Sequence, residues 1–497
     1  MNRVERSLVT ILLASFLPFQ VFSRNDVQQS LEFNPFNAAE STKSVVIGGQ
    51  TVSYRVKAAM MPIHDRQEEL NGHIFYVAYT REGIKDISKR PLLFSFNGGP
   101  GSSSVWLHMG FLGPRRVVYD DQGFMLAPPF TLTDNEYSIL DEADLVFIDP
   151  IGTGYSRMSS GKDPHMYHGV NEDIESIAEF IRLYCSRYQR WLSPKFIIGE
   201  SYGTTRAAGL TAYLQSKERM YINGTILLSA MNLGVNPGED LRQALLLPHY
   251  AATAWHHKRL APELQALSLP ELLLIVEPFS LTEYAQALIK GNSISFADKK
   301  KAAEKLEYYT GIAAAIHLNH HLRLDRLQFR RELLAAEGLI VGRLDSRYTA
   351  ARNERTHLSQ FDTDPAMNAW NGPFTAVLNH YLRRELGFKT DRNYAIFGDV
   401  RPWRGMAEIR VGEMLHQAMI QNPYLKVLVM AGYFDGATDH FTIQYAMNHL
   451  DPAGLFKDRV DFAFYECGHM MYLRKTDLIK AKRDLADFIR ANPPKQK

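Results

Sequence analysis

The chain has 497 residues, of which 45% are hydrophobic and 22% charged, and its formal net charge is +2. This length predicts two or three domains, or one large α/β domain that carries an insertion. A nearly balanced charge is atypical of proteins that bind nucleic acid or acidic membrane surfaces, so partners must be argued from local sites.

Residues 1–23 have the pattern of an export signal. Two arginines precede an apolar run that Pro18 and Gln20 interrupt, and small or polar residues follow. We expect this segment to be cleaved, which places the mature chain in the periplasm or outside the cell; a membrane-anchored N-terminal helix is the alternative. Residues 24–43 are polar and are predicted to be a flexible segment. No later segment reads as long and apolar enough to span a bilayer.

From Val45 onward the sequence alternates between strand and helix patterns. The strand patterns include HIFYVAYT (73–80), PLLFSF (91–96), ADLVFID (143–149), KFIIGE (195–200), GTILLSA (224–230), KVLVMAG (426–432) and VDFAFYE (460–466). The first strands read as hairpins and the later ones alternate with helices, which predicts a mostly parallel sheet with helices on both faces. We therefore predict an α/β fold whose core spans 44–235 and resumes over 401–497.

The loop NGGPGSSS occupies residues 97–104, directly after a buried strand pattern. Its glycines allow the backbone to approach another group closely where the strand ends. Three serines in a row suggest a nucleophile, but a better candidate follows later in the chain. We expect these serines to cap or pack the helical segment VWLHMGF that comes next.

The strongest chemical signal is GESYG at 199–203, which matches G-x-S-x-G. A strand pattern precedes it and a helix pattern follows it, which is the setting in which a serine lies on a sharp, strained turn with its Oγ exposed. Ser201 is therefore the candidate nucleophile. A tight turn with a spectator serine is the alternative.

Strand patterns are missing between 236 and 400. This stretch is rich in Leu, Ala, Glu, Lys and Arg and is punctuated by prolines, so we interpret it as a helical cap insertion. An insertion at this point of an α/β sheet usually lies over the edge where ligands bind, which makes it a candidate lid. Adjacent histidines at 256–257 and 320–321 point to different faces of a helix, and we predict neither a metal site nor a cofactor.

Partners for the serine follow the last two strand patterns. A serine hydroxyl needs an imidazole to remove its proton, and the imidazole needs an acceptor on its other nitrogen. Asp435 comes directly after KVLVMAG and His469 follows VDFAFYE, in the order that this kind of sheet requires. Asp439 is the alternative acid, and it could instead cap a helix beginning near His440.

With NGGPGSSS, GESYG, AGYFD and CGHMMY in this order, the chain resembles the serine carboxypeptidase-like family (peptidase family S10), which has the α/β-hydrolase fold. The resemblance covers most of residues 45–490. It implies an exopeptidase that acts on a peptide with a free C-terminus through an acyl-enzyme on Ser201, with His469 as the base and Asp435 as its orienting acid. An esterase or acyltransferase on the same triad is the second reading, and an inactive binding protein on this scaffold is the third.

The chain has only two cysteines, Cys185 and Cys467, and lacks those that would form the several disulfides of eukaryotic family members. Together with the export signal, this resembles a bacterial exported member of the family. A core of this size needs no covalent staple, so two buried thiols are favoured, although one bridge stays open.

The resemblance also assigns the groups that contact the substrate. The oxyanion hole would consist of the backbone N–H groups of Gly99 and Tyr202, in agreement with the general rule for a nucleophile on such a turn. The terminal carboxylate would be held by Asn97 and Gly98 together with two glutamates that share a proton, one of which is Glu200.

The second of these glutamates is missing, because Phe111 stands at its position. Two close carboxyls cannot both ionise, so a pair retains a proton that can bond a carboxylate. For Glu200 alone the pKa is set by desolvation, and we expect either a weaker dependence on acid pH or an arginine that shares the carboxylate. Arg115 and Arg116 are the nearby candidates, with ordinary surface charges as the alternative.

Overall fold

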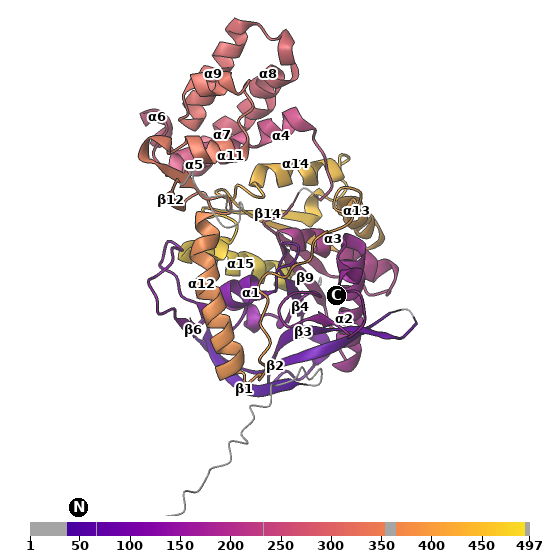
Figure 1. Ribbon diagram of the computed structural model, residues 1–497. Coiled ribbons are helices and arrows are strands. Elements are labelled where there is room, and N and C mark those ends of the chain that lie inside the picture. Colours follow the sequence, from indigo (N-terminus) through magenta and orange to yellow (C-terminus); the bar gives the residue numbers. More distant parts are fainter. Residues whose placement is uncertain (1–36, 66, 232, 353–363, 493–497) are drawn as a thin grey trace, which may run out of the picture.

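The computed structural model describes residues 37–65, 67–231, 233–352 and 364–492 (Figure 1). The predicted export signal and the following residues up to 36 lie outside this range. The rest of the segment predicted to be flexible is not a loose chain, because residues 38–43 belong to strand β1 (Ala38–Ile47). They pair with β2 through the backbone ladder and through a cross-strand ion pair of 3.2 Å between Glu40 and Lys57.

One sheet runs through the molecule in the strand order β1-β2-β3-β7-β4-β9-β10-β13-β14, with β8 paired to β3. Its further strands are β2 (Gln50–His64), β3 (Leu70–Arg81), β4 (Leu92–Phe96), β7 (Asp144–Ile148), β8 (Arg157–Met158), β9 (Lys195–Glu200), β10 (Gly224–Leu228), β13 (Lys426–Gly432) and β14 (Val460–Tyr465). In this order the strands from β7 to β14 run parallel to one another, whereas β1, β2, β3 and β8 form antiparallel pairs and β3 also pairs antiparallel with β7. The predicted mostly parallel α/β sheet is confirmed.

Helices cover both faces of this sheet, as parallel strands require. The first face is covered by α2 (Val170–Arg187), α3 (Tyr202–Ser216), α13 (Val411–Gln421) and α14 (His440–Leu450). The second face is covered by α1 (Val105–Leu107), the π-helix η2 (His108–Leu112), α12 (Pro365–His380) and α15 (Lys475–Ala491). Every residue of β4, β7, β9 and β10 is buried between these layers, so the site at their carboxyl ends rests on a rigid platform.

A separate helical body lies above the sheet at the top of Figure 1. It packs around its own apolar core and contains α4 (Glu239–Leu245), α5 (Leu247–His256), α6 (Pro262–Gln265), α7 (Leu269–Phe279), α8 (Ala285–Ile289), α9 (Phe296–Thr310), α10 (Ala314–Asn319) and α11 (Arg326–Glu332). The body is narrower than the predicted span of 236–400, because α12 packs into the core of the sheet. It also contains two antiparallel strands, β11 (Leu339–Val341) and β12 (Thr349–Ala351), which are too short to give a periodic signal.

The segment Leu269–Ile289 is long and apolar enough to cross a membrane, with a mean hydropathy of 1.3 over its best window, and is the one such helix among the described residues. The prediction that no such later segment exists is therefore wrong by length and composition. The structure uses the segment as a core helix of the insertion, where Leu272, Val276 and Leu288 are buried. A single helix of this kind is weak support for a membrane span, because core helices of globular proteins meet the same criteria.

Candidate active site

Ser201 lies at the carboxyl end of β9, on the turn that leads into α3. Its backbone has φ +60° and ψ −126°, a strained conformation that side chains rarely adopt. Gly199 makes the turn possible, because a Cβ at that position would lie 2.0 Å from the carbonyl oxygen of Gly203. The sequence between these two glycines therefore folds as a strand, a strained turn and a helix, with Ser201 at the apex.

Asp435 and His469 meet beyond the ends of β13 and β14. Asp435 Oδ2 lies 2.7 Å from His469 Nδ1. The other oxygen, Oδ1, accepts hydrogen bonds from the backbone N–H groups of Ala437 and Thr438, at 2.8 and 3.0 Å. Because the carboxylate is fixed from two sides, it holds the imidazole in one orientation.

The surroundings of this pair favour an ionised Asp435 beside a protonated His469. Burial alone would raise the pKa of Asp435, but the imidazole and the hydrogen bonds from Thr438 hold it below its usual value. Burial would likewise lower the pKa of His469, yet Asp435 and then Glu200 raise it above the usual value. A protonated His469 is thus stabilised, which is what a general base needs when it accepts a proton.

The alternative acid, Asp439, has the capping role that was considered for it. Its Oδ1 accepts a hydrogen bond of 2.8 Å from the N–H of Thr442, in the first turn of α14, and the residue is the N-cap of that helix. An ion pair of 3.0 Å with Arg326 occupies its other oxygen. Asp439 is therefore committed elsewhere, and Asp435 is the acid in contact with His469.

Ser201, His469 and Glu200 line one cavity of about 200 Å³. Among the described residues, no hydrogen bond links Ser201 Oγ to His469 Nε2, although both side chains face this space. Such bonds are often long or absent before a substrate binds, so the geometry permits the pairing without completing it.

The NGGPG loop approaches the start of α3 closely. A Cβ at Gly98 would lie 2.4 Å from the backbone nitrogen of Tyr202, so only glycine permits this approach. Within the described chain, neither the Gly99 N–H nor the Tyr202 N–H donates to a protein acceptor. Both predicted oxyanion donors are therefore available to a ligand beside Ser201.

Two of the serines that follow this loop pack against it and the next helix, as expected of the helix, but Ser104 does not cap that helix through its side chain. Both the N–H and the Oγ of Ser104 donate to Asp149 Oδ1, at 2.9 and 2.8 Å. Ser102 Oγ accepts a hydrogen bond of 2.9 Å from Trp106 Nε1. Burial raises the pKa of Asp149 to about 6, so this carboxylate is ionised at neutral pH and anchors the loop.

Glu200 is buried at the end of β9 and is bonded to a residue that the sequence reasoning missed. The hydroxyl of Tyr472 donates a hydrogen bond of 2.7 Å to Glu200 Oε2. Burial raises the pKa of Glu200 to about 7, against the opposing influence of His469, Tyr472 and Asn97. The carboxyl therefore holds its proton under mildly acidic conditions without a second carboxyl beside it.

Phe111, which stands where the resemblance implies a second glutamate, contacts this tyrosine. Its ring is fully buried in η2 and stacks on the ring of Tyr472, with centroids 5.4 Å apart and planes 4° from parallel. The hydrogen-bond partner of Glu200 is thus a tyrosine held by an aromatic stack. The signal lay in the motif CGHMMY, where Tyr472 follows His469 by three residues.

Asn97 is fixed by its oxygen and offers its nitrogen. Its Oδ1 accepts a hydrogen bond of 3.1 Å from the N–H of Leu107. Its Nδ2 is buried and makes no hydrogen bond of standard geometry among the described residues, although it lies close enough to Glu200 to lower the pKa of that carboxyl. The side chain lines the cavity with Ser201, and a buried donor whose hydrogen bonding is incomplete favours a ligand acceptor at this point.

The prediction that Arg115 or Arg116 reaches the substrate is wrong. Arg115 pairs with Asp134 and with Glu385, the latter at 2.7 Å, and neither arginine lines the cavity. The arginine that does line it is Arg343, from the insertion. Sequence spacing could not indicate it, because the contact depends on how the insertion folds back.

A second and larger cavity adjoins the first. Its volume is about 1120 Å³, and it shares Gly99, Met367 and Phe397 with the catalytic cavity. Its other lining side chains combine apolar groups, among them Trp403 and Met406, with the polar groups of Asn368, Asn371, Asp399 and Arg401. The arrangement offers a small compartment that contains Ser201 and a large one that adjoins it.

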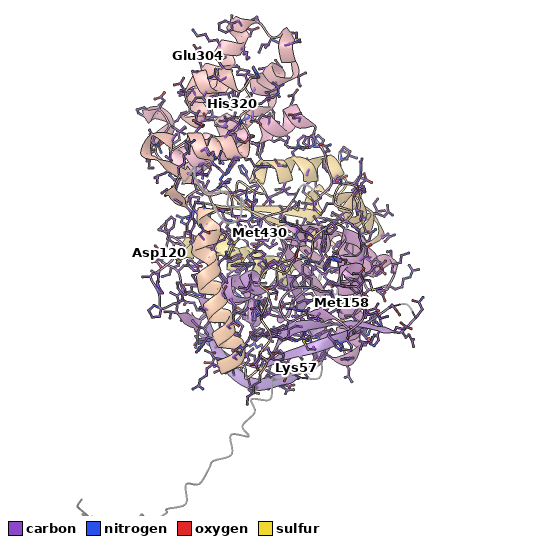
Figure 2. The ribbon with its side chains drawn as sticks, in the orientation of Figure 1. Lys57, Asp120, Met158, Glu304, His320 and Met430 are labelled. Atoms are coloured by element: carbon purple, nitrogen blue, oxygen red, sulfur yellow. The ribbon has the colours of Figure 1, made fainter. Side chains whose placement is uncertain are left out.

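Both thiols are unpaired and buried, as favoured from the sequence. Burial raises the pKa of Cys185 to about 11 and that of Cys467 to about 12, so neither is a nucleophile at neutral pH. No group of three or more His, Cys, Asp and Glu side chains suited to a metal occurs among the described residues. Figure 2 shows His320 in the insertion, well away from Met430 on β13, the strand that leads to Asp435.

Comparison with known proteins relates this arrangement to one family. A model described as serine carboxypeptidase matches residues 56–267. Serine carboxypeptidase-like 29 of Arabidopsis thaliana is 31% identical over 138 residues, or 27% of this chain and 26% of that protein. The pheromone-processing carboxypeptidase KEX1 of Saccharomyces cerevisiae is 32% identical over 146 residues, or 28% of this chain and 19% of that protein.

These matches span roughly a fifth to a quarter of the relatives' length, so the alignments leave most of each protein uncompared. The likeness of folds extends further. The crystal structure of the prohormone-processing carboxypeptidase Kex1(delta)p from S. cerevisiae superposes with a TM-score of 0.55, covering 88% of this chain and 91% of that one at 15% identity. At that identity the superposition shows the α/β-hydrolase fold and nothing beyond it.

Proposed function

We propose that this chain, whose residues 56–267 match the serine carboxypeptidase family, removes the C-terminal residue of peptides by forming an acyl-enzyme on Ser201. The observation that carries the proposal is that Glu200 lies in the same small cavity as Ser201 and His469. Its pKa of about 7 keeps this carboxyl protonated in mildly acidic solution. A protonated carboxyl donates a hydrogen bond to a substrate carboxylate, which selects the end of a peptide chain.

In the proposed mechanism, Ser201 Oγ attacks the carbonyl carbon of the last peptide bond while His469 Nε2 takes its proton. Asp435 holds the other imidazole nitrogen and stabilises the charge that His469 acquires. The N–H groups of Gly99 and Tyr202 bind the oxyanion, and losing such a donor costs about 3 kcal/mol in the transition state. His469 then protonates the leaving amine, and a water molecule activated by the same imidazole releases the acyl group.

In the proposed binding mode, the terminal carboxylate lies against Asn97, Gly98 and Glu200. The Nδ2 of Asn97 supports this mode, because a carboxylate oxygen would complete its hydrogen bonding beside Glu200. The small compartment then holds the leaving residue, and the larger one, which combines apolar and polar side chains, holds the part of the peptide before the cleaved bond.

The test compares a blocked dipeptide that has a free C-terminus with its amide. Below about pH 7 we expect the free acid to be preferred by about tenfold to a hundredfold in kcat/KM, the usual worth of a hydrogen bond to a charged group. Ser201→Ala should abolish turnover of both, and Glu200→Gln should remove the loss of activity at higher pH because an amide cannot ionise. Equal turnover of acid and amide by the wild type would exclude recognition of the terminal carboxylate.

A second candidate function is ester hydrolysis or acyl transfer on the same triad. Phe111 in place of an acid and a catalytic cavity lined by Trp106, Trp370 and Met231 favour it, because an apolar pocket accepts an acyl chain. Turnover of short acyl esters without turnover of peptides would support this candidate instead. Failure of a fluorophosphonate probe to label Ser201 would favour the inactive binding protein.

We also propose export of the chain after removal of residues 1–23, which lie outside the described residues. The sequence pattern alone supports this proposal. Sequencing the N-terminus of the protein recovered from its native host should give a start near residue 24. An intact N-terminus in the membrane fraction would support the anchored alternative.

A further inference from the structure

The insertion places one arginine in the catalytic cavity. Arg343 lies in the loop between β11 and β12 and lines the cavity together with Ser201, Glu200 and His469. We propose that Arg343 is a specificity-determining residue that binds the terminal carboxylate of the substrate, a role that rests on the carboxypeptidase function proposed above.

Charge is the first argument. Among the described residues that line this cavity, Arg343 is the one side chain whose positive charge does not depend on pH, since Glu200 and His469 both titrate and the others are neutral. Its charge reaches the catalytic base, because it acts to lower the pKa of His469. In a space of about 200 Å³, a carboxylate bound beside Ser201 lies within the field of the guanidinium.

The backbone of Arg343 is held firmly relative to the catalytic histidine. The N–H groups of Arg343 and Leu344 donate to the two oxygens of Asp364, each at 3.1 Å. The carbonyl of Leu344 accepts a hydrogen bond of 2.7 Å from the N–H of His469. The arginine and the base are therefore joined through one loop.

The side chain of Arg343 is partly exposed where it lines the cavity. It is 24% exposed, and its guanidinium lies 4.0 Å from Asp364 Oδ2, at the outer limit of an ion pair. A guanidinium has five N–H donors, so it can bind a carboxylate through two parallel N–H groups beside its other contacts.

The proposed contact between Arg343 and the substrate carboxylate also compensates for the glutamate that is missing at Phe111. A family pattern with two carboxyls binds the substrate through a shared proton, whereas here Tyr472 is the hydrogen-bond partner of Glu200 and leaves the pocket with a single acid. A fixed cation from the insertion supplies the electrostatic attraction that one neutral carboxyl lacks. Carboxylate recognition is thus divided between the sheet and the insertion.

The experiment measures kcat/KM of wild type, Arg343→Gln and Arg343→Lys on three substrates: a blocked dipeptide acid, its methyl ester, and a dipeptide acid that ends in glutamate. Arg323→Gln is the matched control, because Arg323 is also a part-exposed arginine of the insertion paired with a carboxylate, Asp240. We expect Arg343→Gln to lower kcat/KM for the acids by about tenfold or more relative to the ester, mainly through KM. A change in the basicity of His469 acts on acid and ester alike and cancels in this ratio. Arg343→Lys should recover part of the loss, and Arg323→Gln should resemble wild type.

Three outcomes would overturn the inference. Equal losses on acid and ester would mean that Arg343 only supports the His469 loop, and no loss on either would mean that it contacts neither. A loss confined to the substrate ending in glutamate would assign the arginine to an acidic side chain instead. Ester turnover also reports folding of each variant. If the wild type itself does not prefer acid over ester, the carboxypeptidase proposal fails, whatever the variants do.

Discussion

Under the proposed function, the proton on Glu200 decides which substrates bind, and the surroundings of this carboxyl are unusual. Burial is the main reason that its pKa is about 7, and the groups that act against or with burial are His469, Tyr472, Asp435 and Asn97. Below that pH the neutral carboxyl can donate to a substrate carboxylate, and above it the ionised form repels one. We therefore expect activity on free-acid substrates to fall as the pH rises through neutrality.

Replacing Tyr472 by phenylalanine tests whether the proton on Glu200 sets this pH dependence. The tyrosine hydroxyl bonds the ionised carboxylate and so lowers the pKa of Glu200; without it the pKa must rise further. In Tyr472→Phe, the decrease in kcat/KM for a free-acid dipeptide with rising pH should therefore occur at a higher pH than in the wild type. Tyr284→Phe, which removes a buried hydroxyl bonded to the Leu322 carbonyl in the insertion, is the control and should leave the profile unchanged. A shift to lower pH would contradict the assignment.

Asp435 can be tested with an isosteric change. Asp435→Asn keeps the shape of the side chain but presents an amide to His469 Nδ1, which favours the wrong tautomer of the imidazole. By analogy with other triads, kcat should fall by about 10⁴. Thermal unfolding measured alongside should show a folded protein, and the companion variant Asp439→Asn should retain most activity because Asp439 caps α14. A larger loss of activity in Asp439→Asn than in Asp435→Asn would reverse the assignment.

At the scale of elements, the loop 342–348 is the segment that ties the insertion to the catalytic histidine. Asp345 forms a buried ion pair of 2.7 Å with Arg347 and accepts a hydrogen bond of 3.2 Å from the N–H of Gly468, next to His469. Arg347 also donates to Cys467 Sγ at 2.9 Å. This buried cluster fixes the histidine loop from the side of the insertion.

Removing the Asp345 carboxylate should lower the stability of the fold. Asp345→Ala leaves Arg347 as an uncompensated buried charge, for which about 3–5 kcal/mol of stability is the expected loss. The matched change at an exposed pair, Asp240→Ala opposite Arg323, should cost less than about 1 kcal/mol. Urea denaturation of both variants gives the comparison, and similar losses would show that the cluster is not a structural anchor.

The sequence predicted the elements whose signals are local. The strand before Ser201, the turn at its glycines, the cap at Asp439 and the alternating strands and helices all depend on residues close in the chain. What escaped prediction depends on contacts between distant segments. Tyr472 reaches Glu200 across 272 residues, and Arg343 enters the cavity because the insertion folds back onto the sheet. Spacing cannot report such contacts, which is also why Arg115 looked suitable and was not.

At the scale of the whole molecule, a large compartment of about 1120 Å³ adjoins the small compartment of about 200 Å³ that contains Ser201. Under the proposed function, the small compartment suits one amino-acid residue and the large one suits the preceding segment of the peptide. Val400, Trp403 and Met406 in the large compartment favour apolar residues in that segment.

A charge in the larger compartment should alter that preference. Met406 lines it and is part-exposed, so Met406→Glu should fold normally but disfavour apolar residues before the cleaved bond. We expect kcat/KM for peptides with such residues to fall about tenfold relative to those with polar residues, which is typical of burying an unpaired charge. Met125→Glu, at a comparably exposed methionine outside both cavities, should not change the ratio. An unchanged ratio in both variants would show that the larger compartment does not hold the substrate.

The anchoring of the histidine loop by Asp345 and Leu344 also has a consequence for biosynthesis. Ser201 leaves the ribosome 268 residues before His469, and the histidine loop can dock only after the insertion has presented Asp345. Because domains fold as units from the N-terminal side during translation, the nascent chain carries its nucleophile on a finished turn long before it has a base. Under the proposed function, we therefore expect the chain to be inactive while it is being made and to gain its reactivity with one of the last segments to be added.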